Sequence, residues 1–258
     1  MDEQLVIERR IDMVSVISFN RPERHNALND ALSTQWCQVL RAAIADPDVR
    51  CILLRGEGRS FSSGRDTSEL GQRVGGESDL AFVRRAQEMR LATLAAPKPV
   101  VAALKGYVFG GAFEIALSAD MRVAASDAVF AFPEIRFGLV ADTGGTQLLT
   151  PLTGPSKAKY LLLSGERVDA ATALAWGFVD RLVEPGALDD DALELARSLA
   201  ASPPHAAAMT KQLVDQAWAG SIRNGVAQEL IAQVALFAGD DHRRAKEEQS
   251  ERMRERNS

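Results

Sequence analysis

The chain has 258 residues, of which 46% are hydrophobic and 25% are charged, and its formal net charge is −5. This composition is ordinary for a globular protein and argues against disorder or a collagen-like structure. The negative charge provides no overall positive field, so neither nucleic acid nor an anionic membrane is expected as a partner. The length fits one large core with an appended segment better than it fits two independent folds.

Neither a targeting signal nor a membrane span is expected. The N-terminal stretch MDEQLVIERR is acidic and polar, whereas a secretory signal has a basic stretch followed by an apolar one. No window approaches the roughly 20 apolar residues that span a bilayer, because Lys98 and Lys105 interrupt the best candidate. We therefore predict a cytoplasmic protein. Cys37 and Cys51 are too few for a disulfide framework or a zinc site, and we expect both in the core.

Strands and helices alternate in the first half of the chain. A hairpin over residues 5–19 is predicted because β-branched residues recur on both sides of Asp12. Asn29 precedes an amphipathic helix in which every fourth residue from Leu32 to Ile44 is apolar. The elements expected next are a strand at 51–56, a Gly- and Ser-rich turn at 56–66, a helix near 79–94 and a strand at 99–105.

The second half begins with a short helix entered through Gly110 and Gly111 and becomes mostly helical beyond Gly154. The expected elements are strands at 121–125 and 128–132, a single later strand at 178–183 and a helix at 187–202. A boundary near Pro203 divides the chain into a core of residues 1–200 and a helical region of residues 201–258.

The helical region carries an apolar stripe that needs a partner surface. The stripe lies beyond a cap at Ser221, and its members are Ile222, Val226, Leu230, Ile231, Val234 and Phe237. We expect it to mediate oligomerisation. The residues from 239 onward are highly charged, and we interpret them as a solvated helix or a frayed tail.

Missing motifs disfavour several enzyme classes. His25, His205 and His242 are not paired at metal-ligand spacing, so zinc chemistry is not expected. No G-x-S-x-G elbow is present, which argues against a serine hydrolase. The glycine-rich patterns that cradle nucleotide phosphates do not occur either. We expect the protein to act without a metal or redox cofactor.

Two glycine-marked turns could supply hydrogen-bond donors to an oxyanion. Gly110 and Gly111 open a helix directly after a strand, so unpaired N–H groups and the positive end of the helix dipole face the strand end. Gly64 marks another strand exit, where the next residue could aim its N–H into the same space. From spacing alone, both turns could instead be merely tight turns.

Three carboxylates lie near these turns. Glu114 stands in an apolar run after Gly111, so it is either solvent-facing or buried with a perturbed pKa. Glu134 follows a predicted strand end, and Asp142 precedes a predicted helix start, where it could be only an N-cap. Acids beside glycine-formed N–H donors suit acid/base chemistry on a carbonyl compound.

Four segments, in order, resemble the crotonase superfamily (the enoyl-CoA hydratase/isomerase family) over roughly residues 5–237. NRPERHNALN resembles the segment that begins the family's coenzyme A pocket, and FSSGRD resembles its F-x-A-G-x-D turn. GYVFGGAFEIALSADMRVAA is similar to its glycine-rich helix entry, and FAFPEIRFGLVADTGGTQLL to its F-x-x-P-E segment. Four such motifs together are specific, whereas any one alone is not.

The resemblance implies an α/β fold, a spiral of strand-strand-helix units that holds the acyl-CoA site, with a helical C-terminal region that forms trimers and often hexamers. It implies that the N–H groups of Arg65 and Gly111 form the oxyanion hole for the thioester carbonyl, while Glu114 and Glu134 position and activate a water. The residues that it places in substrate binding are Arg24, Ala27, Ser63, Gly64, Asp66, Thr67, Tyr107 and Gly110.

Some positions depart from the family pattern. Asp142 falls where the hydratases usually carry glycine and the Δ3,5-Δ2,4-dienoyl-CoA isomerases carry aspartate, although those isomerases tend to have aspartate at the position of Glu114. Ser68 stands where some members have a lysine near the coenzyme's phosphates, so Arg24 or Arg21 is expected to contact them.

The leading hypothesis is hydration of a 2-enoyl-CoA to a 3-hydroxyacyl-CoA by an enzyme of fatty acyl-CoA thioesters. A dienoyl- or 3-enoyl-CoA isomerase that uses Asp142 as a third catalytic acid is the close alternative. An acyl-CoA hydrolase or decarboxylase and a non-catalytic acyl-CoA-binding scaffold on the same fold are further alternatives. The two intact glutamates argue against the scaffold.

Overall fold

The structure is a computed structural model that describes residues 4–69, 74–217, 222–237, 240–241, 244 and 251. A six-stranded sheet forms its centre, with the strand order β1-β2-β3-β4-β6-β9. Its strands are β1 (Val6–Ile11), β2 (Val14–Phe19), β3 (Cys51–Gly56), β4 (Val100–Leu104), β6 (Met121–Ala125) and β9 (Arg181–Val183). Only the predicted hairpin β1–β2 is antiparallel in this sheet.

A smaller sheet of three strands lies beside the first and carries the turn that matters for the site. It is formed by β5 (Tyr107–Phe109), β7 (Val129–Ala131) and β8 (Val168–Asp169) in that order. The strand β8 was not predicted, because two residues are too few to show a periodic pattern. The strand predicted at 178–183 is confined to β9, and Phe178 and Val179 before it are core residues.

Alternate residues of the central strands serve two separate cores. Ile52 and Leu54 of β3 face a core that α1 and α3 cover, whereas Cys51 and Leu53 face a second core under α7. Strands buried on both faces are typical of parallel sheets, which explains their continuous apolar runs. Cys51 is buried as predicted, and Cys37 is half-buried against the first core.

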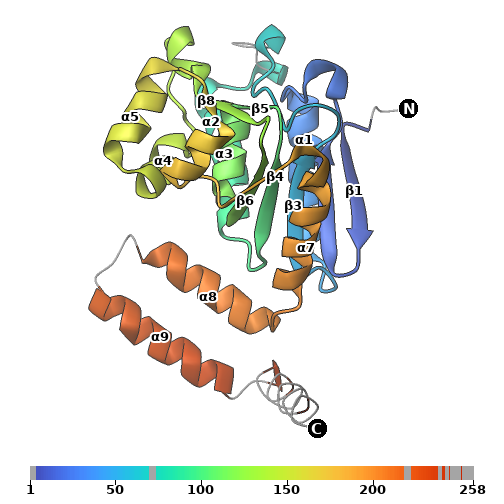
Figure 1. Ribbon diagram of the computed structural model, residues 1–258, viewed down its shortest axis with the longest axis vertical. Coiled ribbons are helices and arrows are strands. Elements are labelled where there is room, and N and C mark those ends of the chain that lie inside the picture. Colours follow the sequence, from blue (N-terminus) through green and yellow to red (C-terminus); the bar gives the residue numbers. More distant parts are fainter. Residues whose placement is uncertain are drawn as a thin grey trace.

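Helices cover both faces of the large sheet (Figure 1). Asn29 caps α1 (Asp30–Ala45) by accepting a hydrogen bond from the Leu32 N–H, and Ser78 caps α2 (Asp79–Leu94) in the same way. On the opposite face, α7 (Leu188–Ala200) packs on β3, β4 and β6. The remaining core helices are α3 (Gly111–Ser118), α4 (Gly145–Thr153), α5 (Pro155–Ser164) and α6 (Ala170–Trp176).

Successive strand pairs produce the predicted spiral. In each of two consecutive units the first strand joins the large sheet and the second joins the small one: β4 with β5, and β6 with β7. The helix α3 follows β5, and a 3-10 helix over Pro133–Phe137 follows β7. The residues after β5 and after β7 are thereby brought together, which positions the site.

Two helices extend from the core at the C-terminal end (Figure 1). They are α8 (Pro204–Gln216), which begins at the predicted boundary, and α9 (Ile222–Phe237), which packs on α8. Lys211 ties α8 to the core through an ion pair of 2.9 Å with Asp120. None of the described helices is long and apolar enough to cross a membrane.

The predicted apolar stripe lies on α9. Leu230, Ile231 and Val234 are 60–71% exposed in the single chain. Ser221 and the side chains of Ile222, Val226 and Phe237 lie outside the described part of the chain. The division into a core and an oligomerisation region stays a prediction.

Candidate active site

The first predicted donor turn is held by a short parallel pairing of Leu28 with Arg65. The Leu28 N–H donates to the Gly64 carbonyl at 2.8 Å, and the Asp66 N–H donates to the Leu28 carbonyl at 3.0 Å. Because backbone groups alternate in direction along an extended chain, the N–H of Arg65 between them points away from Leu28. This leaves it available to a ligand.

The second donor turn lies at the start of α3. Gly111 is the first residue of this helix, so its N–H has no partner four residues back within the helix. Gly64 packs against the chain just before it: a Cβ at Gly64 would lie 2.6 Å from the Phe109 carbonyl oxygen. Gly64 also has a φ of +86°, which favours glycine. The two predicted donor turns are therefore direct neighbours.

Glu114 is buried, with 1% exposure, which decides between the two possibilities left open by the sequence. Its Oε1 accepts the backbone N–H groups of Thr143 and Gly145, each at 2.8 Å, and its Oε2 accepts the Thr143 hydroxyl at 2.5 Å. Burial raises the pKa of Glu114, whereas the hydrogen bonds from Thr143 and the charge of Arg90 oppose the increase. Three of its roughly four lone-pair positions are taken, so one remains for a ligand or water.

Glu134 lies in the 3-10 helix after β7, and its carboxylate rests on Gly110. Among the described residues, its buried Oε2 has no hydrogen-bond partner. Burial, followed by repulsion from Glu114 and Asp142, raises the pKa of Glu134 to about 7. A carboxyl of this kind is partly protonated at neutral pH and can serve as an acid or a base.

Asp142 is not the cap of the following helix, so that alternative is wrong. The N-cap position of α4 is Gly144, where the helix begins without a side-chain hydrogen bond. Asp142 is exposed overall, but its carboxyl is partly buried, and this burial raises its pKa. The charge of Asp142 also raises the pKa values of Glu134 and Arg90. The structure therefore brings the three predicted acids into one electrostatic cluster.

Arg90 of α2 completes the cluster and was missed by the sequence reasoning. It is 6% exposed, and its Nη2 donates to the Gly111 carbonyl at 3.0 Å. Burial lowers the pKa of Arg90 to about 10, although the charges of Glu114 and Asp142 raise it. The same helix also contains Arg84 and Arg85, which are more exposed. The sequence of α2 alone therefore does not show which of its arginines is buried.

Two of the other predicted binding residues, Ala27 and Asp66, flank the Leu28–Arg65 pairing in the chain. Ala27 is buried, and its carbonyl accepts a hydrogen bond of 3.1 Å from the Arg21 guanidinium. Asp66 pairs with Arg21 at 2.5 Å, and hydrogen bonds from Ser68 and Arg21 lower the pKa of Asp66 to about 2. Arg21 is thus engaged within the protein, whereas Arg24 is exposed. Arg24 is therefore the better candidate for a phosphate contact.

Tyr107 belongs to a group of aromatic and basic side chains around β5. Its ring stacks on Phe109 with centroids 4.9 Å apart and lies 5.0 Å from the ring of His25. The guanidinium of Arg167 lies over both Tyr107 and Phe109. Arg167 was missed because it arrives from a distant part of the chain. Ser63 donates its N–H to the His25 carbonyl, and Thr67 is exposed nearby in the chain.

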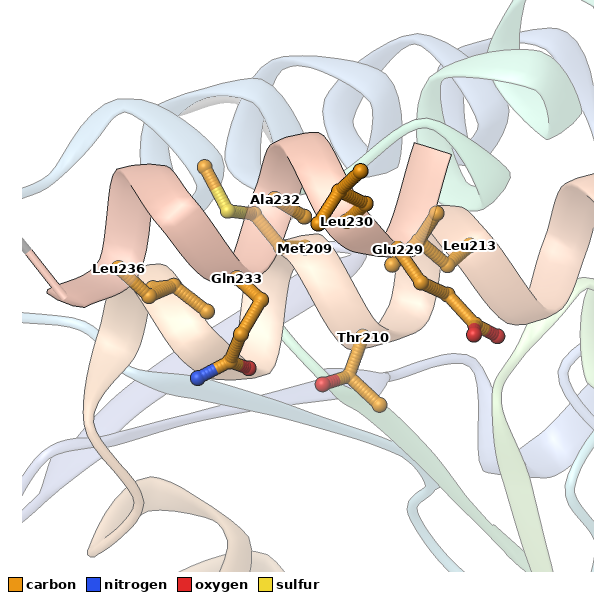
Figure 2. Close-up of a pocket in the computed structure, with 8 residues that line it drawn as sticks. All are labelled: Met209, Thr210, Leu213, Glu229, Leu230, Ala232, Gln233 and Leu236. Carbon is orange, nitrogen blue, oxygen red and sulfur yellow. The ribbon is translucent and has the colours of Figure 1, made fainter. Parts of the chain in front are cut away.

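A separate cavity of about 520 Å³ lies between α8 and α9, on a different part of the protein from the acids. Figure 2 shows its walls, which include Met209 and Leu213 from α8 and Leu230 and Leu236 from α9. It contains none of the predicted catalytic residues. All of its lining residues belong to α8 and α9, so this cavity is not the candidate active site.

Comparisons with known proteins identify the class to which this spiral fold and cluster of acids belong. The family model described as enoyl-CoA hydratase/isomerase matches residues 9–256. The short-chain-enoyl-CoA hydratase of Clostridium acetobutylicum is 33% identical over 253 residues, which is 95% of this chain and 94% of the relative. The 1,2-epoxyphenylacetyl-CoA isomerase of Escherichia coli is 36% identical over 209 residues, 79% of each chain.

A solved structure agrees with these sequence relationships. The enoyl-CoA hydratase from Thermoplasma volcanium is similar with a TM-score of 0.88 and 30% identity, over 95% of this chain and 97% of that one. The chain therefore belongs to the enoyl-CoA hydratase/isomerase family, and it is an enzyme of that family. The predicted α/β fold of the crotonase superfamily is confirmed.

Proposed function

We propose that the protein hydrates a 2-enoyl-CoA to a 3-hydroxyacyl-CoA. The observation that carries the proposal is the placement of two differently held carboxyls beside the donor turns: Glu114 with three hydrogen bonds and Glu134 with an unpaired buried oxygen. Burial raises the pKa of both glutamates, and carboxyls with perturbed pKa values in a shared site are typical of acid/base catalysis.

In this mechanism the thioester carbonyl accepts hydrogen bonds from the Arg65 and Gly111 N–H groups. Negative charge that develops on this oxygen is stabilised by both donors, and loss of one such donor typically costs about 2.7–4 kcal/mol. The polarised thioester draws electrons from the double bond, so C3 becomes open to attack by water. Gly64 and Gly110 shape the turns that present the donors.

The two glutamates would divide the proton transfers. Glu114, which accepts three hydrogen bonds and keeps one lone-pair position open, holds the water and accepts its proton as the hydroxyl adds to C3. Glu134, with a pKa of about 7, delivers a proton to C2. One water is thereby added across the double bond, and proton exchange with solvent restores both carboxyls.

A second candidate reaction is isomerisation of a dienoyl- or 3-enoyl-CoA double bond. It is favoured by Asp142, which is free of any capping role and adds its charge to the cluster. In this reaction one carboxyl removes a proton from the acyl chain and another returns a proton elsewhere. One relative is named as an isomerase, of 1,2-epoxyphenylacetyl-CoA, so isomerisation of an acyl-CoA occurs among proteins similar to this one.

Coenzyme A would approach along the predicted binding residues. Arg24 and Arg167 supply positive charge for its phosphates, and the rings of Tyr107 and Phe109 provide a stacking surface. The protein would act as a trimer or a dimer of trimers assembled through the C-terminal helices. The reaction needs no metal or redox cofactor.

The deciding experiment is product analysis with crotonyl-CoA, a longer 2-enoyl-CoA and a 3,5-dienoyl-CoA. Hydration is expected to consume the 2-enoyl absorbance and to add the mass of one water. Isomerisation changes the absorbance of the dienoyl-CoA at constant mass. Conversion of the dienoyl-CoA alone would contradict the hydratase proposal, and release of free coenzyme A would point to hydrolysis.

A further inference from the structure

Arg90 is a buried cation whose hydrogen-bonding groups are largely unused. Among the described residues, its Nε and Nη1 are buried and have no hydrogen-bond partner. Its Nη2 has the single contact to the Gly111 carbonyl. A guanidinium carries five N–H donors and stays protonated, so burying it with one acceptor is unfavourable unless a ligand supplies more.

The neighbouring acids do not fill this deficit. The oxygens of Glu114 are held by Thr143 and Gly145 and form no hydrogen bond with Arg90. The charge of Asp142 acts on Arg90, but no hydrogen bond joins these two described residues. On the other side, the guanidinium lies over the Trp36 ring at 5.3 Å, and that ring offers no acceptor oxygen.

The position of Arg90 connects it to the reacting part of the substrate. A Cβ at Gly111 would lie 3.7 Å from Arg90 Nη2 and 4.0 Å from Glu114 Oε2. The guanidinium and the carboxylate therefore both lie beside the donor turn. One helical turn earlier on α2, the Gln87 side chain donates to the Asp142 carbonyl at 2.7 Å. This face of α2 therefore lies next to Glu114 and Asp142.

We propose that Arg90 is a specificity-determining residue that binds an uncharged acceptor oxygen, a carbonyl or a hydroxyl, on the acyl group of the substrate. The inference rests on the proposed acyl-CoA function and names the substrate class: oxygenated acyl thioesters rather than plain alkyl ones. An uncharged acceptor is preferred over a carboxylate because the charges of two acids, Glu114 and Asp142, already act on the single positive charge of Arg90.

Binding of saturated thioesters tests this without any turnover. Dissociation constants would be measured by calorimetry for hexanoyl-CoA, 4-oxohexanoyl-CoA, 5-oxohexanoyl-CoA and adipoyl-CoA. Hydrogen bonds to charged groups contribute enough to predict that the better oxo compound binds at least about tenfold more tightly than hexanoyl-CoA. Equal binding of all three uncharged chains would overturn the proposal, and tightest binding of adipoyl-CoA would overturn the assignment of an uncharged acceptor.

Two variants locate the effect. Arg90→Met keeps an unbranched side chain but removes all the guanidinium donors, so it should abolish the oxo preference and leave hexanoyl-CoA binding within about threefold. Arg84→Met changes an exposed arginine of the same helix and should keep the full preference. Equal weakening of every thioester by Arg90→Met would show that Arg90 only holds the Gly111 turn, which contradicts the proposal.

The wild-type measurement stands even if Arg90→Met does not fold. Failure of the proposed hydration would be seen separately, as absence of product from a 2-enoyl-CoA while saturated thioesters still bind.

Discussion

The Glu134 carboxylate rests directly on Gly110, in the space that a side chain at position 110 would fill. Gly110 has a φ of +53°, and its own N–H donates to the Ala131 carbonyl at 3.0 Å, which joins the two turns. The absence of a side chain at one residue thus sets the position of the carboxyl at another. The acid lies next to the donor turn because this glycine lets it approach.

Gly110→Ala should therefore reduce turnover by at least about 100-fold, because the new methyl displaces the carboxyl and general acid–base catalysis contributes about 10²–10⁴-fold. Steady-state kinetics with crotonyl-CoA would measure the loss. Gly154→Ala is a matched control, since its φ of +78° imposes similar strain but no atom lies within 4 Å of the added Cβ. Equal rates for the two variants would contradict the placement of Glu134.

Glu134→Gln should lower turnover by about 10²–10⁴-fold while acyl-CoA binding survives, because glutamine keeps the size but cannot transfer a proton. In hydration Glu134 acts as the acid, so kcat/KM of the wild type should fall as the pH rises through about 7. That descending limb should be missing in the residual activity of the variant. A limb that persists unchanged would assign it to another group.

The same carboxyl makes the stability of the fold depend on pH. Its pKa is about 7 in the folded protein and near the ordinary 4.5 in the unfolded chain, so the folded state binds more protons between these values. Stability relative to Glu134→Gln should be highest below about 4.5, fall as the pH rises to about 7 and stay level above it. Chemical denaturation of both proteins across this range would measure the difference, and a constant difference would contradict the raised pKa.

Asp142→Asn separates the two candidate reactions. The change removes the charge but keeps the size of a residue that does not cap α4. We expect any dienoyl- or 3-enoyl-CoA isomerase activity to fall by at least about tenfold and 2-enoyl-CoA hydration to change much less. Equal loss of both activities would place Asp142 in the common proton-transfer steps. Equal retention would leave it without a catalytic role.

Ile231→Asp should disrupt the predicted trimer or hexamer, because it places a charge in the middle of the exposed stripe on α9. Light scattering at micromolar concentration would give the mass of each protein. Leu80→Asp is the control: Leu80 is similarly exposed, at 68%, but lies at the start of α2 in the core region. A monomeric wild type would contradict the assembly prediction.

Local patterns in the sequence determined the elements themselves. The recurrence of apolar residues and the Asn29 cap define α1, and the run CILLRG coincides with β3, because each depends only on neighbours along the chain. The ordered glycine and glutamate motifs likewise identified the family and the two turns predicted to supply the N–H donors. These motifs are informative because a tight turn requires glycine and proton transfer requires a carboxylate, each at a fixed spacing in the chain.

The tertiary structure decided what those residues experience. Glu114 is buried, and its Oε1 accepts hydrogen bonds from the N–H groups of Thr143 and Gly145, which are 29 and 31 residues away in the chain. The same fold places Gly144 rather than Asp142 at the cap position of α4. The packing of α2 on α3 buries Arg90 and brings it to the Gly111 carbonyl, which the sequence of α2 alone does not signal. Burial and charge act through space, so a carboxyl or guanidinium obtains its pKa from neighbours that the chain brings together only on folding.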